Sequence, residues 1–127
     1  MRMLTERPRV LVADDHAELA KAVCRMLSLE CDVVGTVSDG SALMEATGRL
    51  RPDVIVLDVN LRDVNGLEAC RQITQVSPGT KVIMFTAMDD PEIIERSFEL
   101  GAAGFVSKAS SHGDLLKTVK RVCADGH

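Results

Sequence analysis

The chain has 127 residues, of which 46% are hydrophobic and 27% are charged, and its formal net charge is −4. These values are typical of one folded domain, and the acidic balance argues against direct binding of nucleic acid by this segment. The opening MRMLTERPRV lacks the apolar segment of a signal peptide, and no stretch approaches the roughly 18 apolar residues of a membrane span, so we expect a cytoplasmic chain without membrane contact.

Patterns typical of strands and helices alternate from the start of the chain. RVLVAD, residues 9–14, is apolar on both faces of a strand and runs into two adjacent acids, Asp14 and Asp15. A helical stripe follows, formed by Leu19, Val23, Met26 and Leu27. CDVVGTV, residues 31–37, is rich in β-branched residues and predicts a second strand. The next helical stripe is Leu43, Ala46 and Leu50. We expect Pro52 to end that helix.

Three further strands are predicted in the rest of the chain. VIVLD, residues 54–58, is again apolar on both faces and again ends in an acid, Asp58. KVIMFTA, residues 81–87, predicts the fourth strand, and AGFVSK, residues 103–108, predicts the fifth.

Each of these strands is followed by a helical pattern. The apolar stripes are Leu67, Cys70 and Ile73; then Ile94 and Phe98; then Leu115, Val119 and Val122. Asp90 and Pro91 are typical of the N-cap and the first position of a helix. Ser111 and Asp114 have the spacing of a capping box before the last helix. Four cysteines form no CxxC pair, and we expect them to be buried thiols.

Five strand–helix units predict an α/β fold. Strands that are buried on both faces and separated by helices indicate a parallel sheet with helices on each side. We therefore expect a doubly wound, five-stranded (βα)5 domain with the flavodoxin-like strand order 2-1-3-4-5. In that order, ligands bind at the carboxyl ends of the first and third strands. Residues 1–127 are expected to form one domain with no second, output domain among them.

The first and third strands are neighbours in this order, so Asp14, Asp15 and Asp58 should meet at one edge of the sheet. Two carboxylates roughly 4 Å apart repel each other by about 4 kcal/mol at an effective dielectric constant near 20. We expect a bound cation to offset this repulsion. Ligands that are all oxygen favour a hard ion such as Mg²⁺, and Mn²⁺ is also possible.

Two polar side chains should join the acids at this edge. The fourth strand ends at Thr86, which carries a hydroxyl group, and the fifth ends at Lys108. The hydroxyl is a directional donor and the ammonium group is a compact charge, so both can bind phosphoryl oxygens. A central aspartate can itself accept a phosphoryl group covalently.

These motifs carry a resemblance to a known family. VLVADD, VIVLD, MFTA and FVSK, in this order and spacing, resemble the receiver domain of two-component response regulators over roughly residues 8–125. The resemblance implies that a sensor histidine kinase or a phosphotransfer protein phosphorylates Asp58. It also implies that Asp14, Asp15 and Asp58 hold Mg²⁺ together with the main-chain carbonyl of Asn60. Such a domain is not an ordinary enzyme, although self-phosphorylation from small donors and autodephosphorylation are expected.

The same resemblance implies how the signal is read and where it goes. Thr86 and Lys108 match the hydroxyl and lysine positions of the family, and Phe105 matches its aromatic switch position. A homodimer could form on phosphorylation. LLKTVKRVCADGH, residues 115–127, resembles the last helix of receivers that continue into a LuxR-type DNA-binding domain. Transcription is therefore the expected output, and DNA would be bound only through a C-terminal domain outside residues 1–127.

Two positions depart from the family pattern. Many receivers have Met-Pro in the loop after the acceptor, where this chain has Leu61 and Arg62, with Gly66 still eight residues after Asp58. Without the proline we expect a less restrained loop. Many receivers also have a proline after the lysine, often in the cis form. Ala109 stands there, so a cis peptide bond is not expected.

Other interpretations remain open at this point. Asp14 and Asp15 could merely cap the helix that begins near Ala17. A Mg²⁺-dependent phosphohydrolase with an aspartyl nucleophile uses a similar sheet, but it typically needs a second acid two residues after the nucleophile, where this chain has Asn60. A flavin-binding carrier of like topology is disfavoured by the acidic crevice and by the absence of Tyr and Trp.

Two positions are expected to set the lifetime of an aspartyl phosphate. Asn60 lies two residues after the acceptor, and Met88 lies two residues after Thr86. The amide of Asn60 can orient an attacking water, whereas the flexible apolar chain of Met88 can cover the site. Because the two effects oppose each other, we predict an intermediate lifetime.

Overall fold

The computed structural model describes residues 7–110 and 112–125, which form a parallel sheet with the strand order β2-β1-β3-β4-β5. The strands are β1 (Arg9–Ala13), β2 (Asp32–Val37), β3 (Val54–Leu57), β4 (Lys81–Thr86) and β5 (Gly104–Ser107). The helices are α1 (Ala17–Leu27), α2 (Gly40–Leu50), α3 (Gly66–Val76), α4 (Pro91–Glu99) and α5 (His112–Asp125). The predicted fold and strand order are confirmed, and each predicted strand agrees with the observed one to within a residue at either end.

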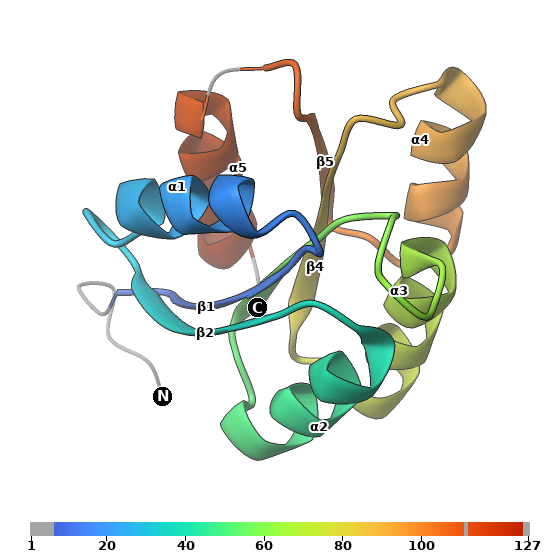
Figure 1. Ribbon diagram of the computed structural model, residues 1–127, viewed down its shortest axis with the longest axis horizontal. Coiled ribbons are helices and arrows are strands. Elements are labelled where there is room, and N and C mark those ends of the chain that lie inside the picture. Colours follow the sequence, from blue (N-terminus) through green and yellow to red (C-terminus); the bar gives the residue numbers. More distant parts are fainter. Residues whose placement is uncertain (1–6, 111, 126–127) are drawn as a thin grey trace.

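The helices cover both faces of the sheet. Figure 1 shows α1 and α5 on one side and α2, α3 and α4 on the other. Successive residues of a strand point to opposite faces, so β1 sends Val10 and Val12 into one core cluster and Leu11 and Ala13 into the other. Phe85, on the face with α1 and α5, is a large side chain in an otherwise mainly aliphatic interior. The two-sided burial explains why the strands are apolar without alternation.

Helix α4 differs from the expected pattern. Phe98 was predicted to lie on its apolar stripe, but its side chain is 48% exposed. Ser97 is fully buried instead, and its hydroxyl donates to the carbonyl of Ile93 at 2.8 Å. Ile93 itself packs against the core on this face. The stripe is therefore rotated by about one residue, because a small serine lets the helix lie close to the sheet while Phe98 remains in water.

The helix boundaries follow the expected signals in most places. Asp90 is the N-cap of α4 and Pro91 stands in its first turn, as predicted, although the Asp90 side chain makes no capping hydrogen bond. Helix α2 ends just before Pro52, at a left-handed C-cap residue, Arg51, with φ of 47°. Ser111, the proposed start of the capping box before α5, lies outside the described residues.

The cysteines are partly as expected. Cys31 and Cys70 are fully buried, and Cys24 and Cys123 are half-buried. Burial raises the pKa of Cys31 to about 11, and the neighbouring Cys123 thiol adds to this rise. Burial alone raises the pKa of Cys70 to about 11. Across residues 7–110 and 112–125, no helix has both the length and the apolar character needed to cross a membrane.

Candidate functional site

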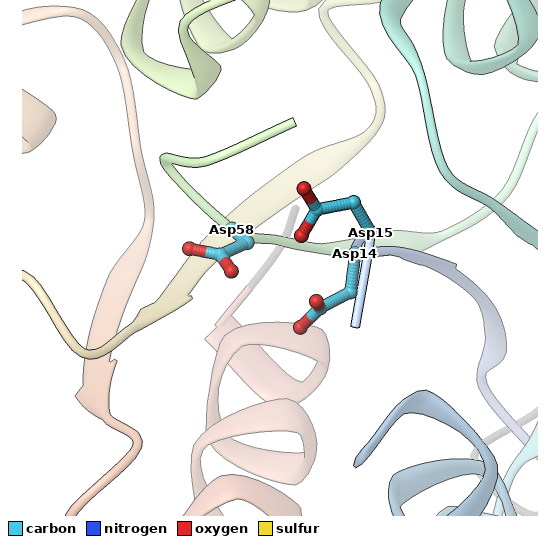
Figure 2. Close-up of side chains that lie close together, drawn as sticks. All are labelled: Asp14, Asp15 and Asp58. Atoms are coloured by element: carbon cyan, nitrogen blue, oxygen red, sulfur yellow. The ribbon is translucent and has the colours of Figure 1, made fainter. Parts of the chain in front are cut away.

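Three acidic side chains meet at the carboxyl edge of the sheet. Strands β1 and β3 are paired so that Ala13 lies opposite Leu57, and the amide of Asp58 donates to the carbonyl of Ala13 at 3.0 Å. The next residue of each strand is therefore an acid at the same edge. One carboxylate oxygen from each of Asp14, Asp15 and Asp58 lies within 4.8 Å of the others, and Figure 2 shows the three side chains close together.

A lysine lies between two of these acids. The Nζ atom of Lys108 is 2.7 Å from Oδ2 of Asp14 and 2.7 Å from Oδ2 of Asp58. Both carboxylates are buried, at 6% and 5% exposed, and the lysine side chain is 14% exposed. Burial lowers the pKa of Lys108, but the hydrogen bonds that it donates to Asp14 and Asp58, and the negative charges of these two carboxylates, outweigh the effect of burial, so the pKa is raised overall. The ammonium group therefore offsets the repulsion between Asp14 and Asp58, which is one part of the repulsion for which a bound cation was expected.

The remaining oxygens of these acids are held by the backbone. Oδ1 of Asp14 accepts from the amide of His16 at 2.8 Å, and Oδ1 of Asp58 accepts from the amide of Asn60 at 3.2 Å. Among the described residues, no buried side-chain nitrogen or oxygen lacks a hydrogen-bond partner. The buried acids are thus fixed in position before any ligand arrives.

The donor set suits a hard divalent cation. Asp14, Asp15 and Asp58 offer three carboxylate oxygens in one small volume, and Asp15 is exposed to solvent at its mouth. Oxygen ligands on one side with water on the other are the arrangement that Mg²⁺ prefers in sites that also bind phosphate. Lys108 competes for two of these acids. A bound ion and the Lys108 ammonium group would therefore both contact the carboxylates of Asp14 and Asp58.

The helix-capping interpretation explains only part of this acidic pair. The N-cap of α1 is His16, which is exposed and whose side chain makes no capping hydrogen bond. Asp14 does accept the His16 amide and so closes the turn before the helix. Capping does not account for Asp15, nor for the contact between Asp14 and Lys108.

Thr86 completes the edge from the next strand. Its side chain is fully buried, and its Oγ1 accepts from the amide of Met88 at 3.2 Å. Its carbonyl accepts from the amide of Lys108 at 2.9 Å, which joins the ends of β4 and β5. The structure therefore brings a hydroxyl, an ammonium group and three carboxylates to the ends of four neighbouring strands.

The loop between β3 and α3 is tied to its neighbour. The amide of Arg62 donates to the carbonyl of Ser38 at 3.3 Å. Oδ1 of Asp63 accepts from the amide of Gly40, the first residue of α2, at 2.5 Å. These two hydrogen bonds restrain the loop in the absence of the proline that many receivers have there. The sequence carries no signal for these bonds, because Asp63 is one of several loop acids with no distinguishing pattern.

Gly66 shapes the floor of the site. Its amide donates to the carbonyl of Val59 at 2.6 Å, and a Cβ atom built on it would lie 2.1 Å from the carbonyl oxygen of Asp58. Only glycine lets the start of α3 approach the end of β3 so closely. The sequence indicates the position of this glycine, because Gly66 stands eight residues after Asp58, as in the family pattern.

The comparison with known families decides the identity. A family model for the response regulator receiver domain matches residues 10–120. The chain is a response regulator receiver domain. Domains of this family carry signals in two-component systems and are not classical enzymes.

The receiver domain resembles transcription regulators of bacteria. It is 35% identical over 123 residues to the transcriptional regulatory protein NarL of Mycobacterium tuberculosis, covering 95% of this chain and 56% of that protein. It is 32% identical over 120 residues to the transcriptional regulatory protein DegU of Brevibacillus brevis, covering 93% of this chain and 51% of that protein. The receiver domain thus spans about half the length of these curated relatives.

Solved structures agree with this assignment. The signal receiver domain of the response regulator NarL from Mycobacterium tuberculosis has a TM-score of 0.88 at 35% identity, over 96% of this chain and 99% of that one. A LuxR-family two-component response regulator from Aurantimonas sp. SI85-9A1 has a TM-score of 0.90 at 25% identity, over 94% of this chain and 87% of that one. The phosphohydrolase and flavin interpretations are therefore not favoured.

The expected switch residues lie on one face of the receiver domain. Phe105 on β5 is half-buried against the core cluster on the side of α2, α3 and α4, opposite Met84 in the strand register. Thr86 follows Met84 by two residues, so the two side chains point to the same face. Met88, expected to cover the phosphoryl group, is 38% exposed in the loop after β4. All described peptide bonds, including the one before Ala109, are trans.

A cleft opens beside the acids. It has a volume of about 590 Å³ and lies between α1, β2 and the loop after β3. Asp14 and Asp15 form part of its lining, together with the basic residues Lys21, Arg25 and Arg62. The exposed side of the acidic edge, at Asp15, therefore opens into this cleft.

Proposed function

We propose that this receiver domain is a phosphorylation-dependent switch in which Asp58 accepts a phosphoryl group from a sensor histidine kinase or a phosphotransfer protein. The observation that carries the proposal is the buried Asp58 carboxylate, 2.7 Å from Lys108 and beside Asp14 and Asp15. A carboxylate held in place among cationic and metal-binding groups is suited to nucleophilic attack on phosphorus. Residues 8–125 would form the core of this single receiver domain.

The transfer needs one bond to form and one to break. A carboxylate oxygen of Asp58 forms a bond to phosphorus, and the bond from phosphorus to the donor nitrogen breaks. The electron pair of that bond stays with the donor imidazole, which takes up a proton. Lys108, which contacts Oδ2 of Asp58 in the resting site, would then contact the oxygens of the new phosphoryl group instead. The positive charge of the lysine would stabilise these oxygens.

A divalent ion fits the remaining side of the site. Asp14, Asp15 and Asp58 would hold Mg²⁺ or Mn²⁺, with the main-chain carbonyl of Asn60 as a further ligand. When bound, the ion would supply positive charge that screens the acids from the incoming phosphoryl oxygens. The carboxylates of Asp14 and Asp15 do not transfer protons in this scheme; their part is to fix the ion beside the acceptor.

Thr86 and Phe105 would report the phosphorylated state. The phosphoryl group adds roughly −1.5 to −2 charges and strong acceptor oxygens, toward which the Thr86 hydroxyl would move. Phe105 would then fill the space that Thr86 vacates; its ring has no polar group to leave unsatisfied. This would reshape the face formed by α4, β5 and α5 and bias dimerisation or partner binding. Identical NMR shifts across that face with and without a phosphate mimic would contradict this readout.

We infer that the output is control of transcription. The support is the likeness to transcriptional regulatory proteins that are about twice as long as this chain. DNA would be contacted by a C-terminal domain of a longer protein rather than by the receiver domain. As part of a two-component system the domain would act in the cytoplasm.

The acceptor assignment is tested with a small donor. The purified domain with acetyl phosphate and Mg²⁺ should gain the mass of one phosphate, and omitting Mg²⁺ should slow the gain strongly. Asp58→Asn should abolish it, because an amide is not a competent nucleophile. Asp32→Asn is the matched control, since Asp32 is an exposed aspartate at the opposite edge of the sheet and should leave the rate unchanged. Uptake by Asp58→Asn at the wild-type rate would refute the proposal.

A further inference from the structure

A second polar contact crosses the same pair of strands just outside the acceptor site. The hydroxyl of Ser107 donates to Oδ2 of Asp89 at 2.8 Å and accepts from the amide of Ala109 at 3.1 Å. Ser107 is the last residue of β5 and immediately precedes Lys108. Asp89 lies in the loop between β4 and α4, three residues after Thr86. One hydroxyl thus joins the two loops that follow β4 and β5.

This contact is coupled to Thr86 by the strand register. Thr86 and Ser107 lie opposite each other in the β4–β5 pair. The Thr86 hydroxyl accepts from the amide of Met88, so the loop is folded back on the threonine as well as onto Ser107. If Thr86 moved toward Asp58, its hydroxyl would have to give up the amide of Met88, and the loop would lose that tie to β4. The Asp89–Ser107 bond would then still hold the loop in the arrangement seen here, in which Asp58 carries no phosphoryl group.

We propose that the Asp89–Ser107 hydrogen bond is a latch that holds the loop between β4 and α4 in its resting arrangement. It thereby sets how readily the switched arrangement is reached. This inference rests on the proposed function of Asp58. Neither residue touches the acceptor, so both are positioning residues. A hydrogen bond that exists only in the resting arrangement stabilises that arrangement over the switched one by the free energy of the bond. A ligand that binds only the switched arrangement must overcome this free energy, so its affinity is lowered by the corresponding factor.

The variants separate the bond from the charge. Ser107→Ala removes the donor, and Asp89→Ala removes the acceptor and its charge. Ser107→Thr keeps the hydroxyl, and Asp89→Asn keeps an acceptor oxygen without the charge. Asp90→Asn removes a charge from the next residue of the loop, whose side chain makes no capping bond. It is the matched control for a general electrostatic effect on the acidic site.

The test is the affinity for beryllofluoride, a phosphate mimic, measured by NMR titration with saturating Mg²⁺. Ser107→Ala and Asp89→Ala should each bind it about three to ten times more tightly than the wild type, as expected for loss of one hydrogen bond. The double variant should gain no more than either single variant. Ser107→Thr and Asp90→Asn should bind as the wild type does. A merely structural bond would leave the affinity unchanged or weaken it.

The outcomes distinguish the latch from the acceptor assignment. Unchanged or weaker binding in both alanine variants would overturn the latch while leaving Asp58 as the acceptor. A gain in Asp90→Asn equal to that in Asp89→Ala would also overturn it, because the effect would then be one of charge. Failure of the wild-type domain to bind beryllofluoride at all would overturn the proposed function, and with it the latch.

Discussion

Lys108 is the residue on which the resting site depends most. Its ammonium group contacts both buried acids at 2.7 Å, and no other cationic side chain among the described residues forms an ion pair with them. The position of this lysine could be predicted from the sequence, because it directly follows a strand in the same way as Asp14 and Asp58. Its bridging role could not be predicted, because a strand-end position does not say which acid a long side chain will reach.

Removing Lys108 should destabilise the metal-free domain and increase the effect of metal. Lys108→Met leaves two buried carboxylates without a counter-charge, and we expect the free energy of unfolding to fall by about 2 to 4 kcal/mol. Adding Mg²⁺ should stabilise this variant more than it stabilises the wild type, because the ion no longer competes with the lysine. Urea unfolding with and without Mg²⁺ measures both effects.

The control is a lysine in an exposed ion pair. Lys120 lies 2.7 Å from Glu30, with both side chains about half exposed. Lys120→Met should change the stability little and should leave the Mg²⁺ increment at its wild-type value. Equal Mg²⁺ increments in the wild type and Lys108→Met would show that the lysine and the ion do not compete for the acids.

Met88 is predicted to tune the lifetime of the phosphorylated form. Its side chain is 38% exposed next to the end of β4, so a polar replacement there meets solvent and should not disturb the core. Met88→Glu or Met88→Lys should change the autodephosphorylation rate several-fold, about the effect of one water-orienting contact, while phosphorylation remains possible. Decay constants measured on Asp58-phosphate that match the wild type would mean that Met88 does not face the phosphoryl group.

Among the helices and strands, the sequence predicts the strands best, because both faces of each inner strand are buried. The strands could be predicted because a short apolar run between helical patterns has few alternatives. The inward face of α4 could not be predicted, because Ile93, Ile94, Ser97 and Phe98 allow two adjacent stripes, and only packing against the sheet selects between them. The bond between Asp89 and Ser107 had no signal at all, since polar residues are ordinary in loops.

The loop from β3 to α3 should be intolerant of a single methyl group at Gly66. A Cβ atom there would lie 2.1 Å from the carbonyl oxygen of Asp58, so the start of α3 must move away from Asp58. We expect Gly66→Ala to lower the free energy of unfolding by about 2 kcal/mol or more and to slow phosphorylation. The loss is measured by chemical denaturation.

Gly48 is the matched control for this substitution. It lies within α2, and a Cβ atom there would meet nothing within 4 Å. Gly48→Ala should therefore stabilise the domain by about 0.5 to 1 kcal/mol through helix propensity. A Gly66→Ala variant as stable and as active as Gly48→Ala would contradict the close packing of α3 on the end of β3.

At the scale of the whole molecule, each face of the sheet contains one buried thiol. Cys31 lies in the cluster with α1 and α5, and Cys70 lies in the cluster with α2 and α3. Each has its pKa raised from 9.0 to about 11, first of all by burial. A folded-state pKa above the unfolded value gives stability that is intact below pH 9 and is lost as the pH rises toward 11.

The stability of the domain should therefore fall between pH 9 and 10 although the native contacts are unchanged. Between pH 9 and 10, each thiol lowers the free energy of unfolding by an amount that approaches about 1.4 kcal/mol per pH unit. The reason is that the unfolded chain releases a proton that the folded chain retains. Urea unfolding under reducing conditions at pH 8, 9, 9.5 and 10 measures the slope. Cys70→Ala should remove the contribution of that thiol and leave those of Cys31 and Cys24, whose pKa burial also raises. A free energy of unfolding that stays flat up to pH 10 would show that the thiols are accessible.

We predict that Asp58, and no other acid of the edge, carries the phosphoryl group. An aspartyl phosphate is an acyl phosphate, which borohydride reduces to the corresponding alcohol, so the modified aspartate becomes homoserine. The domain would be treated with acetyl phosphate and Mg²⁺, reduced and digested, and its peptides sequenced by tandem mass spectrometry. We predict homoserine at position 58 alone. Homoserine at position 14 or 15, or a phosphorylated protein in which no aspartate is reduced, would contradict the assignment.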